Sequence, residues 1–270
     1  MRWWHIPLAL ILSTTALLAW MAANARVDPV VRRATIAMPD WPAGAPPVKL
    51  LLWSDLHLGN RATDARRLTR IADQVNALKP DLVVLAGGFV AGHERADADA
   101  APGLTEPLAR LRPSLGVVAV LGNHDYWTHA ATIRAALERA GVRVLANEAL
   151  RAGPLALAGL DDRITRHARL SATRIAMARV GGAPVLLTHT PEVPGFVRGL
   201  VVAGHTHCGQ IVLPIIGPPV EATHARSRCG IIRDGDRTTV VTAGTGTSVL
   251  PLRFAAPPDL WLLTLRPAIR

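Results

Sequence analysis

Lysine is almost absent from this chain of 270 residues, in which Lys49 and Lys79 are the only two. The formal net charge is nevertheless +10, so arginine supplies nearly all of the positive charge. The sequence has no Lys/Arg block and no alternation of arginine with aromatic residues, the patterns that track nucleic acid, and we expect no nucleic-acid partner. A positive field would still attract phosphorylated substrates and anionic lipid surfaces.

Cysteine is equally scarce, with Cys208 and Cys229 as the only two. This number excludes a disulfide framework and a zinc site made of cysteines. We expect two free thiols, and one bridge between them is the alternative. Disorder is excluded because 50% of the residues are hydrophobic. The length suits one large α/β domain or two small ones.

The first 25 residues hold an apolar run from Ile6 to Met21. The run is short for a membrane helix of about 20 residues, but Trp3, Trp4 and Trp20 would serve as interfacial anchors. The Ala-Asn-Ala sequence at 23–25 also resembles a signal-peptidase site. Residues 1–25 are therefore a membrane anchor or a signal segment. We prefer an anchor that holds the protein to the cell membrane, with the extracytoplasmic side favoured.

Residues 26–47 follow as a Pro-rich connector, stiffest from Pro39 to Pro47. From residue 48 to 270, strand-like apolar runs alternate with helical patterns, as in a single α/β domain with a two-layer sheet core and helices outside. The predicted helices span 63–78, 104–112, 132–140 and 168–178. The strand-like runs span 49–54, 81–87, 116–123, 142–147, 155–160, 183–189, 200–207, 209–214, 238–244 and 260–265.

Polar side chains stand at the ends of four of these strand-like runs. Each of the first three groups alone is more typical of a turn, a helix cap or a buried structural histidine, whereas the closely spaced histidine pair of the fourth favours metal binding. Ligands gather at the carboxyl ends of strands in open α/β sheets, and His, Asn and carboxylate together suit Mn, Fe or Zn. Four agreeing strand ends therefore indicate a metal site. The groups are Asp55 with His57, Asn123 to Asp125, His189, and His205 with His207.

These motifs resemble those of the calcineurin-like metallophosphoesterases. D-x-H, G-N-H-D, a histidine before Thr-Pro-Glu, and G-H-T-H occur here in the family's order and cover most of residues 49–270. The resemblance implies a four-layer α-β-β-α sandwich. The N-terminal apolar segment, GHTHCGQ and the closing GTG…PLRF…PPDL resemble a membrane-associated bacterial branch. That branch includes enzymes acting on phosphodiester or pyrophosphate groups, some in lipid A precursors.

The resemblance also implies two divalent ions, Mn, Fe or Zn, that activate a hydroxide for attack on phosphorus. Asp55, His57 and His207 would hold the first ion, and Asn123, His189 and His205 the second. His124 would act at the phosphoryl group as general acid or charge stabiliser, with Asp125 supporting its loop. Arg253 is a candidate for contact with a substrate phosphate. The implied substrate is a phosphorylated small molecule or lipid.

One position departs from the family pattern, which has an aspartate bridging both metals in a Gly-Asp pair after the second strand. The pair here is Gly87-Gly88, so the carboxylate is absent. Two dications roughly 4 Å apart repel by about 16 kcal/mol at an effective dielectric of about 20. We therefore expect one ion to bind weakly or not at all. Glu94, Asp97 and Asp99 follow, and an acidic loop facing solvent is the preferred interpretation over a substitute ligand.

Three hypotheses follow from Gly88. The preferred one is a phosphoester or pyrophosphate hydrolase of weakened activity. The alternative is a catalytically silent, membrane-associated binding protein for a phosphorylated ligand. The third is a substitution at Gly88 in an otherwise ordinary enzyme.

Overall fold

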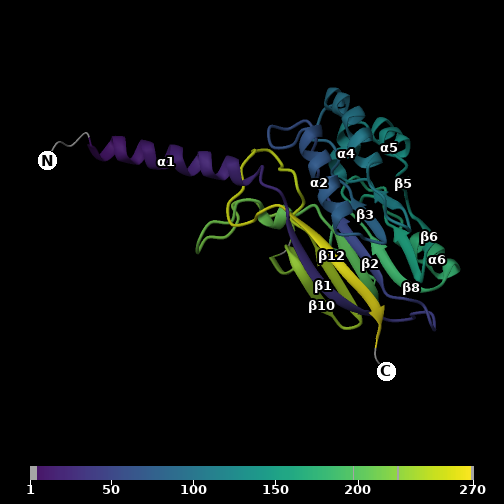
Figure 1. Cartoon of the computed structure of the whole chain (residues 1–270). Helices are drawn as coiled ribbons and strands as arrows, with labels where there is room; N and C mark the ends of the chain where they lie inside the picture. The colour runs from purple at the N-terminus through teal and green to yellow at the C-terminus, as the bar shows by residue number, and fades with distance from the viewer. Residues whose placement is uncertain (1–4, 197, 224, 269–270) are drawn as a thin grey trace.

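The hydrophobic strands of the chain form two six-stranded sheets that pack face to face, with helices on the outer faces (Figure 1). The computed structural model describes residues 5–196, 198–223 and 225–268. The first sheet has the order β1-β12-β2-β3-β4-β5 and the second β10-β11-β9-β8-β7-β6. The strands are β1 (Val30–Met38), β2 (Val48–Trp53), β3 (Leu82–Ala86), β4 (Val117–Val120), β5 (Arg143–Val144), β6 (Glu148–Ala152), β7 (Leu155–Gly159), β8 (Ala183–Leu187), β9 (Gly199–Ala203), β10 (Gly230–Asp234), β11 (Arg237–Val241) and β12 (Asp259–Pro267).

The helices lie mainly between strands, as the alternating sequence pattern predicts. In the helix predicted at 63–78, the Asp64 carboxylate accepts a hydrogen bond from the backbone N–H of Arg67 and so caps the start of the observed helix. The α-helices are α1 (His5–Asn24), α2 (Ala65–Ala77), α3 (Thr105–Ala109), α4 (Asn123–Thr128), α5 (Ala130–Arg139) and α6 (Leu170–Val180). Short 3-10 helices are η1 (Arg95–Leu104), η2 (His207–Gly209) and η3 (Ala225–Ser227).

The side chains of β2 divide between two hydrophobic layers, because successive residues of a strand point to opposite faces. Leu50 and Leu52 lie in the layer between the sheets, whereas Leu51 and Trp53 pack toward the helices. Helices α2, α3 and α5 cover the outer face of the first sheet, and α6 covers that of the second. This is the predicted α-β-β-α arrangement.

The predicted connector at 26–47 contains a strand, which corrects that assignment. β1 pairs in parallel with β12 over nine residues at the edge of the first sheet. The side chains of Ile36 and Met38 are buried against the sheet layer, and the Arg32 guanidinium lies 2.6 Å from the Asp259 carboxylate. The linker was predicted because of the prolines at 39–47, which follow this strand directly, and the alternation of buried and exposed residues within the strand was not recognised.

A second difference concerns residues 209–214, where the sequence predicts a strand. The structure has only isolated bridges at Ile211 and Leu213 within this range. Gly209 adopts a φ of +84°, and Pro214 has no N–H to donate to a ladder. The segment is therefore a loop.

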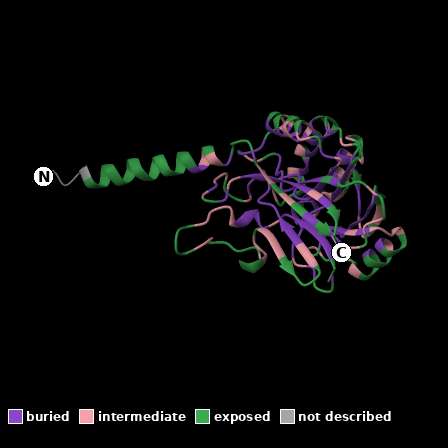
Figure 2. Ribbon diagram, turned by 60° about the horizontal axis from the view of Figure 1, so that its bottom comes forward, coloured by how far each residue is buried: buried purple, intermediate pink, exposed green. Residues whose placement is uncertain are grey.

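Helix α1 projects away from the sheets, with residues 6–20 exposed (Figure 2). Its segment Ile6–Asn24 is long and apolar enough to cross a membrane. The predicted anchors Trp3 and Trp4 lie outside the described residues. At the other end, the backbone N–H of Arg253 donates to the carbonyl of Met21 at 3.1 Å, and the Trp20 ring meets Phe254 edge-on at 5.7 Å between centroids.

Candidate metal centre

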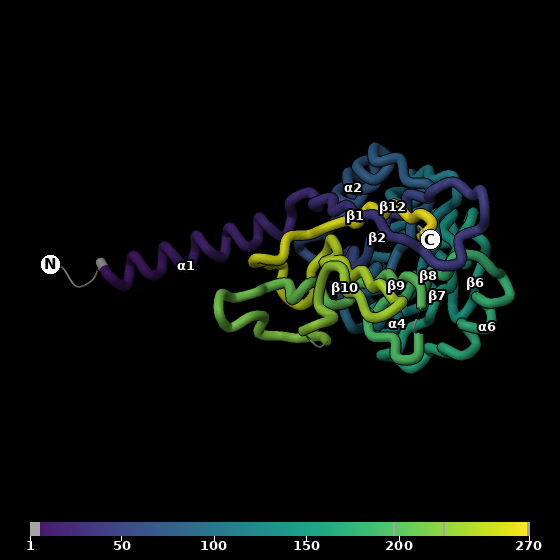
Figure 3. The backbone as a smooth tube through the Cα atoms, turned by 90° about the horizontal axis from the view of Figure 1, so that it is seen from below, coloured from purple at the N-terminus to yellow at the C-terminus, as the bar shows by residue number. Residues whose placement is uncertain are grey.

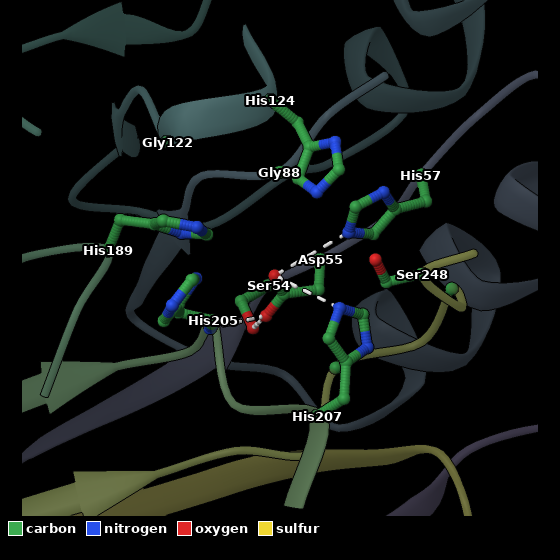
Figure 4. A network of polar contacts seen from close by, with 12 residues as sticks. Ser54, Asp55, His57, Gly88, Gly122, His124, His189, His205, His207 and Ser248 are labelled. Carbon is green, nitrogen blue, oxygen red and sulfur yellow. Dashed lines mark hydrogen bonds and ion pairs between the residues drawn. The ribbon is translucent and has the colours of Figure 1, made fainter. Parts of the chain in front are cut away.

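The carboxyl ends of parallel strands from both sheets meet at one place, where the predicted polar groups come together (Figure 4). The backbone N–H of His205, which follows β9 of the second sheet, donates to the Asp55 carboxylate after β2 of the first at 2.9 Å. The approach of the two sheets requires glycine. A Cβ at Gly204 would lie 2.4 Å from Asp55 Oδ2, and one at Gly122 would lie 2.7 Å from the His189 ring.

Four of the six predicted ligands have left-handed backbone conformations. The φ angles are +50° at Asp55, +46° at His57, +69° at His205 and +48° at His207. Such conformations are uncommon outside glycine and concentrate at functional sites. The bent backbone turns side chains that are two residues apart toward one point, as a shared site needs.

Asp55, His57 and His207 form a buried cluster whose ligand atoms all lie within 4.8 Å of one another. The Nε2 atoms of His57 and His207 lie 3.8 and 3.7 Å from Asp55 Oδ1, too far for hydrogen bonds. Among the described residues, Asp55 Oδ1 and both ring nitrogens of His57 have no hydrogen-bond partner. Separations of this size suit a shared ion with ligand distances of about 2.0–2.2 Å, so these residues fit a divalent metal.

Asn123, His189 and His205 form a second group on the other side of Asp55. His189 Nε2 lies 2.8 Å from Asn123 Oδ1, and the His189 and His205 rings are 5.0 Å apart. His189 Nδ1 donates to the carbonyl of Ala86 at 2.6 Å, the contact that usually fixes a metal-binding histidine with Nε2 as its ligand atom. This donor set also fits a divalent ion.

The protonation states of the site favour metal binding. Burial lowers the pKa of His205 to about 4 and holds the pKa of His207 well below its usual value. Burial alone would raise the pKa of Asp55, but the nearby His207, His57 and His189 outweigh it and keep that pKa below its usual value. Asp55 therefore presents a carboxylate, and His205 and His207 present neutral imidazoles, the forms that bind metals.

His124 lies beside His57, with ring centroids 4.8 Å apart, and lines a cavity of about 500 Å³. Its Nδ1 donates to the carbonyl of Gly92 at 2.8 Å, which leaves Nε2 available to a ligand. Burial lowers the pKa of His124 to about 3, and the nearby His57 adds to this effect. A role as proton donor therefore requires a second proton on the ring.

Asp125 braces the ends of β3 and β4 and makes its contacts with backbone. Its fully buried carboxylate accepts hydrogen bonds from the backbone N–H groups of Gly88, Phe89 and Gly122 at 2.8–3.0 Å. This geometry makes Asp125 a positioning residue and matches the support of the loop that the resemblance implies.

Gly88 lies directly against the first cluster. A Cβ at this position would lie 2.8 Å from Asp55 Oδ1 and 3.4 Å from His57 Nε2. A side chain at position 88 would therefore meet two predicted metal ligands. Asp97, downstream, accepts hydrogen bonds from the backbone N–H groups of His93 and Glu94 and does not take this place.

The prediction that Arg253 contacts a substrate phosphate is wrong, because the side chain is fully buried. Its guanidinium donates to the carbonyls of Ala243, Gly246 and Ala256 at 2.7–2.8 Å. Arg253 therefore holds together the closing loops, and its Nη2 lies 3.5 Å from His207 Nδ1.

The prediction of two free thiols is also wrong, since Cys208 and Cys229 form a disulfide. The alternative of a single bridge is confirmed. The bridge closes the loop that leaves the metal-binding motif immediately after His207. Twenty-one positions of sequence separate the two cysteines, and nothing in their spacing indicated that they would meet.

Sequence reasoning missed further residues around the site. His93 stacks on Trp127 with ring centroids 5.0 Å apart and lies beside His124 at 4.7 Å. Ser248 faces the cavity near His57 and His207 (Figure 4). None of these residues stands at the end of an apolar strand, which was the only signal available in the sequence.

Comparisons of the sequence with a family model and with curated relatives agree with the geometry. A family model described as calcineurin-like phosphoesterase matches residues 48–209. A transmembrane protein with metallophosphoesterase domain from Danio rerio is 30% identical over 97% of this chain, which spans 62% of that relative's length. A metallophosphoesterase of Aquifex aeolicus is 31% identical over 87% of this chain and 91% of its own. Among solved structures, the Pseudomonas putida nuclease MPE is 18% identical, covers 75% of this chain and 80% of its own, and has a TM-score of 0.38.

The matched range includes all six predicted ligands and more than half of the chain. The chain therefore belongs to the calcineurin-like phosphoesterase family, whose members are metal-dependent phosphoester hydrolases.

Proposed function

We propose that this protein hydrolyses phosphoester or pyrophosphate bonds with the help of divalent metal ions, in a lipid-linked or nucleotide-sugar substrate. The observation that carries the proposal is the buried cluster of Asp55, His57 and His207, in which Asp55 Oδ1 and both ring nitrogens of His57 have no hydrogen-bond partner among the described residues. Buried polar atoms are nearly always paired. A cation supplies the missing partner.

In this proposal Asp55, His57 and His207 hold one ion, and Asn123, His189 and His205 hold the other. Bound there, the ions lower the pKa of a water molecule and offset the charge on the phosphoryl oxygens. With its Nδ1–H held by the Gly92 carbonyl, a His124 ring that also carries a proton on Nε2 would donate that proton to the phosphoryl group or to the leaving oxygen.

The absent carboxylate at Gly88 leaves the second ion more weakly held than the first. Asp125 keeps the end of β3 in place through three backbone N–H groups, so the loop keeps its position without a metal ligand of its own. We therefore propose an enzyme that works with one tightly bound ion and one that binds at higher metal concentration.

We further propose that residues 1–25 anchor residues 48–270 to the cell membrane on the extracytoplasmic side. The disulfide between Cys208 and Cys229 supports this side, because disulfides persist in oxidising compartments. The length and apolar character of the segment Ile6–Asn24 support the anchor.

Hydrolysis of bis(p-nitrophenyl) phosphate by the purified full chain tests the proposal. We expect a rate that rises with added Mn²⁺ and vanishes with EDTA. His124→Ala should lower it by about 10²–10⁴-fold, the usual contribution of general acid–base catalysis. His167→Ala, in a ring stacked on Tyr126 outside the cluster, is the matched control. Absence of hydrolysis at every metal concentration would refute the proposal.

A second candidate, a catalytically silent protein that binds a phosphorylated ligand at the membrane, is favoured by Gly88 alone. Calorimetric titration with inorganic pyrophosphate in EDTA separates the two. Tight binding without metal supports the silent binder, whereas a strict requirement for Mn²⁺ supports the hydrolase.

A further inference from the structure

Two loops beside the predicted metal ligands carry a group of exposed hydrophobic side chains. Ile215, Ile216 and Val220 belong to the loop closed by the disulfide, and Val249 and Leu250 belong to the loop that precedes Arg253. Their exposed fractions run from 50% at Leu250 to 91% at Val249 and to complete exposure at Ile215. We call these five residues the apolar rim. Contiguous exposed apolar surface commonly marks a binding face.

The two loops of the rim are held to one another. The Gln210 side-chain amide donates to the carbonyls of Ser248 and Leu250 at 3.0 Å and accepts from the backbone N–H of Ser248 at 2.7 Å. The turn at the tip of the disulfide-closed loop is held by backbone hydrogen bonds between Leu213 and Gly217. The rim is therefore a structured surface.

The rim lies beside the exit of α1 from the domain. Phe254, close to Leu250 in the chain, packs edge-on against Trp20 of α1. In Figures 1 and 3 the loop around residue 215 extends along α1, past the point where the helix meets the domain and toward its N-terminal end. The apolar helix and the apolar rim thus project from the same side of the domain.

The length of α1 sets where a membrane surface would lie. Its 20 residues make a helix of about 30 Å, the thickness of the hydrocarbon core of a bilayer. A bilayer that accommodates all of α1 reaches the level of Trp20 and Met21. The loop that runs back along the helix then lies at or below the bilayer surface.

A groove of about 390 Å³ connects the rim with the metal centre. Trp127, Ile211 and Pro219 line it together with Val220, Val249 and Leu250 of the rim. His205 and His207 line the same groove. An apolar chain lying in it would bring an attached polar group to the predicted ligands.

We propose that the apolar rim enters the lipid bilayer beside α1, so that the groove opens at the membrane and receives the hydrocarbon part of a lipid whose phosphoester group reaches the metal centre. The inference deepens the proposed function and rests on it for the identity of the reaction. The bilayer is the occupant because the rim continues the apolar surface of α1, and no other element of the domain extends along that helix in Figures 1 and 3 within the described residues.

Membrane insertion can be tested without any enzymatic activity. Ile215→Cys and Ile175→Cys variants of the full chain are labelled with an environment-sensitive fluorophore and reconstituted in phosphatidylcholine–phosphatidylglycerol vesicles. Ile175 is exposed on α6, on the far side of the domain from α1 (Figure 1). We expect lipids with nitroxide on the acyl chain to quench the label at 215 and spare the label at 175. Equal quenching by aqueous iodide at both positions would overturn the proposal and would favour a soluble partner for the rim.

A matched pair of substrates tests the groove. Hexadecyl p-nitrophenyl phosphate in vesicles and bis(p-nitrophenyl) phosphate in solution release the same chromophore from the same type of bond. The Ile215→Ser/Ile216→Ser double variant should lower the rate of hydrolysis of the vesicle substrate at least about tenfold, because each isoleucine that enters the lipid contributes strongly to insertion. The rate of hydrolysis of the soluble substrate should be unchanged. Ile175→Ser should alter neither rate. Equal effects on both substrates would contradict the inference, whereas absence of hydrolysis in every protein would refute only the proposed function, since the quenching experiment still stands.

Discussion

Replacement of Gly88 by aspartate tests the position at which this chain departs from its family. The residue has a φ of +71°, and its Cβ would lie 2.8 Å from Asp55 Oδ1 and 3.0 Å from Asp55 Cα. The new side chain therefore enters an already close contact. Its carboxylate would stand beside another buried carboxylate and beside His57.

The new carboxylate should lower the stability of the folded chain without metal and raise it when metal is bound. The left-handed backbone costs about 1–2 kcal/mol for any side chain, and two carboxylates roughly 4 Å apart repel by about 4 kcal/mol at an effective dielectric of about 20. The metal-free Gly88→Asp variant should thus be about 5 kcal/mol less stable than the native chain. The Gly88→Asn variant is the control, because it has the same backbone strain but no carboxylate charge. At the same distance and dielectric, a carboxylate attracts each dication by about 8 kcal/mol, so metal should reverse the order of the two variants.

Thermal unfolding in EDTA and in MnCl2 measures both states, with metal content determined in parallel. Since about 1 kcal/mol shifts the midpoint by about 2–4 °C in a domain of this size, the repulsion of about 4 kcal/mol should make the aspartate variant unfold about 8–16 °C below the asparagine variant in EDTA, and it should unfold above that variant in Mn²⁺. It should also retain two ions, whereas the native chain retains fewer. Identical behaviour of the aspartate and asparagine variants in both conditions would show that position 88 does not face the metals.

Three further predictions concern stability. Burial lowers the pKa of His124 from 6.5 to about 3, so the unfolded chain binds a proton on this ring more tightly than the folded chain, and stability that is present above pH 6.5 is lost as the pH falls. Urea unfolding in EDTA should therefore show that the free energy of unfolding is about 2 kcal/mol lower at pH 5 than above pH 6.5. The His124→Gln variant should not show this loss. Reduction of the Cys208–Cys229 bridge should lower the free energy of unfolding by about 3 kcal/mol for a loop of this length, and an unchanged urea midpoint would contradict that expectation. Arg253→Met should cost about 3–5 kcal/mol, because several buried carbonyls lose their donor; a change below about 1 kcal/mol would mean that other groups replace it.

The layers of the fold and the place of the site were predictable from the sequence. Apolar runs such as Leu50–Trp53 fix strands buried on both faces, and polar residues directly after them mark the sheet edge where ligands gather. The continuous apolar run of β2 and the helical spacing of apolar residues in α2 are both present in the sequence. Agreement among four strand ends predicted the candidate metal centre, because one short polar motif has little meaning alone.

The remaining features depend on contacts between distant segments. β1 is held by β12, more than two hundred residues away, and its alternation is diluted by Arg32 and Arg33. The bridge between Cys208 and Cys229 and the burial of Arg253 depend on how the closing loops fold over the metal centre. The sequence does not distinguish Ile215 and Val249 from apolar residues of the core, and only the structure shows that they are exposed.

The attachment of α1 to the domain affects how the proposed hydrolase would meet a substrate in the membrane. The Asn24 side chain donates to the carbonyl of Arg253 at 3.3 Å, and the Arg26 guanidinium donates to the carbonyl of Arg61 at 2.9–3.0 Å, so the helix is fastened at its last turn. In a membrane, these contacts would fix both the tilt of the domain and its height above the bilayer. Encounter with a lipid would then be a search by lateral diffusion in two dimensions. The rate would follow the mole fraction of substrate in the membrane rather than its concentration in bulk solution.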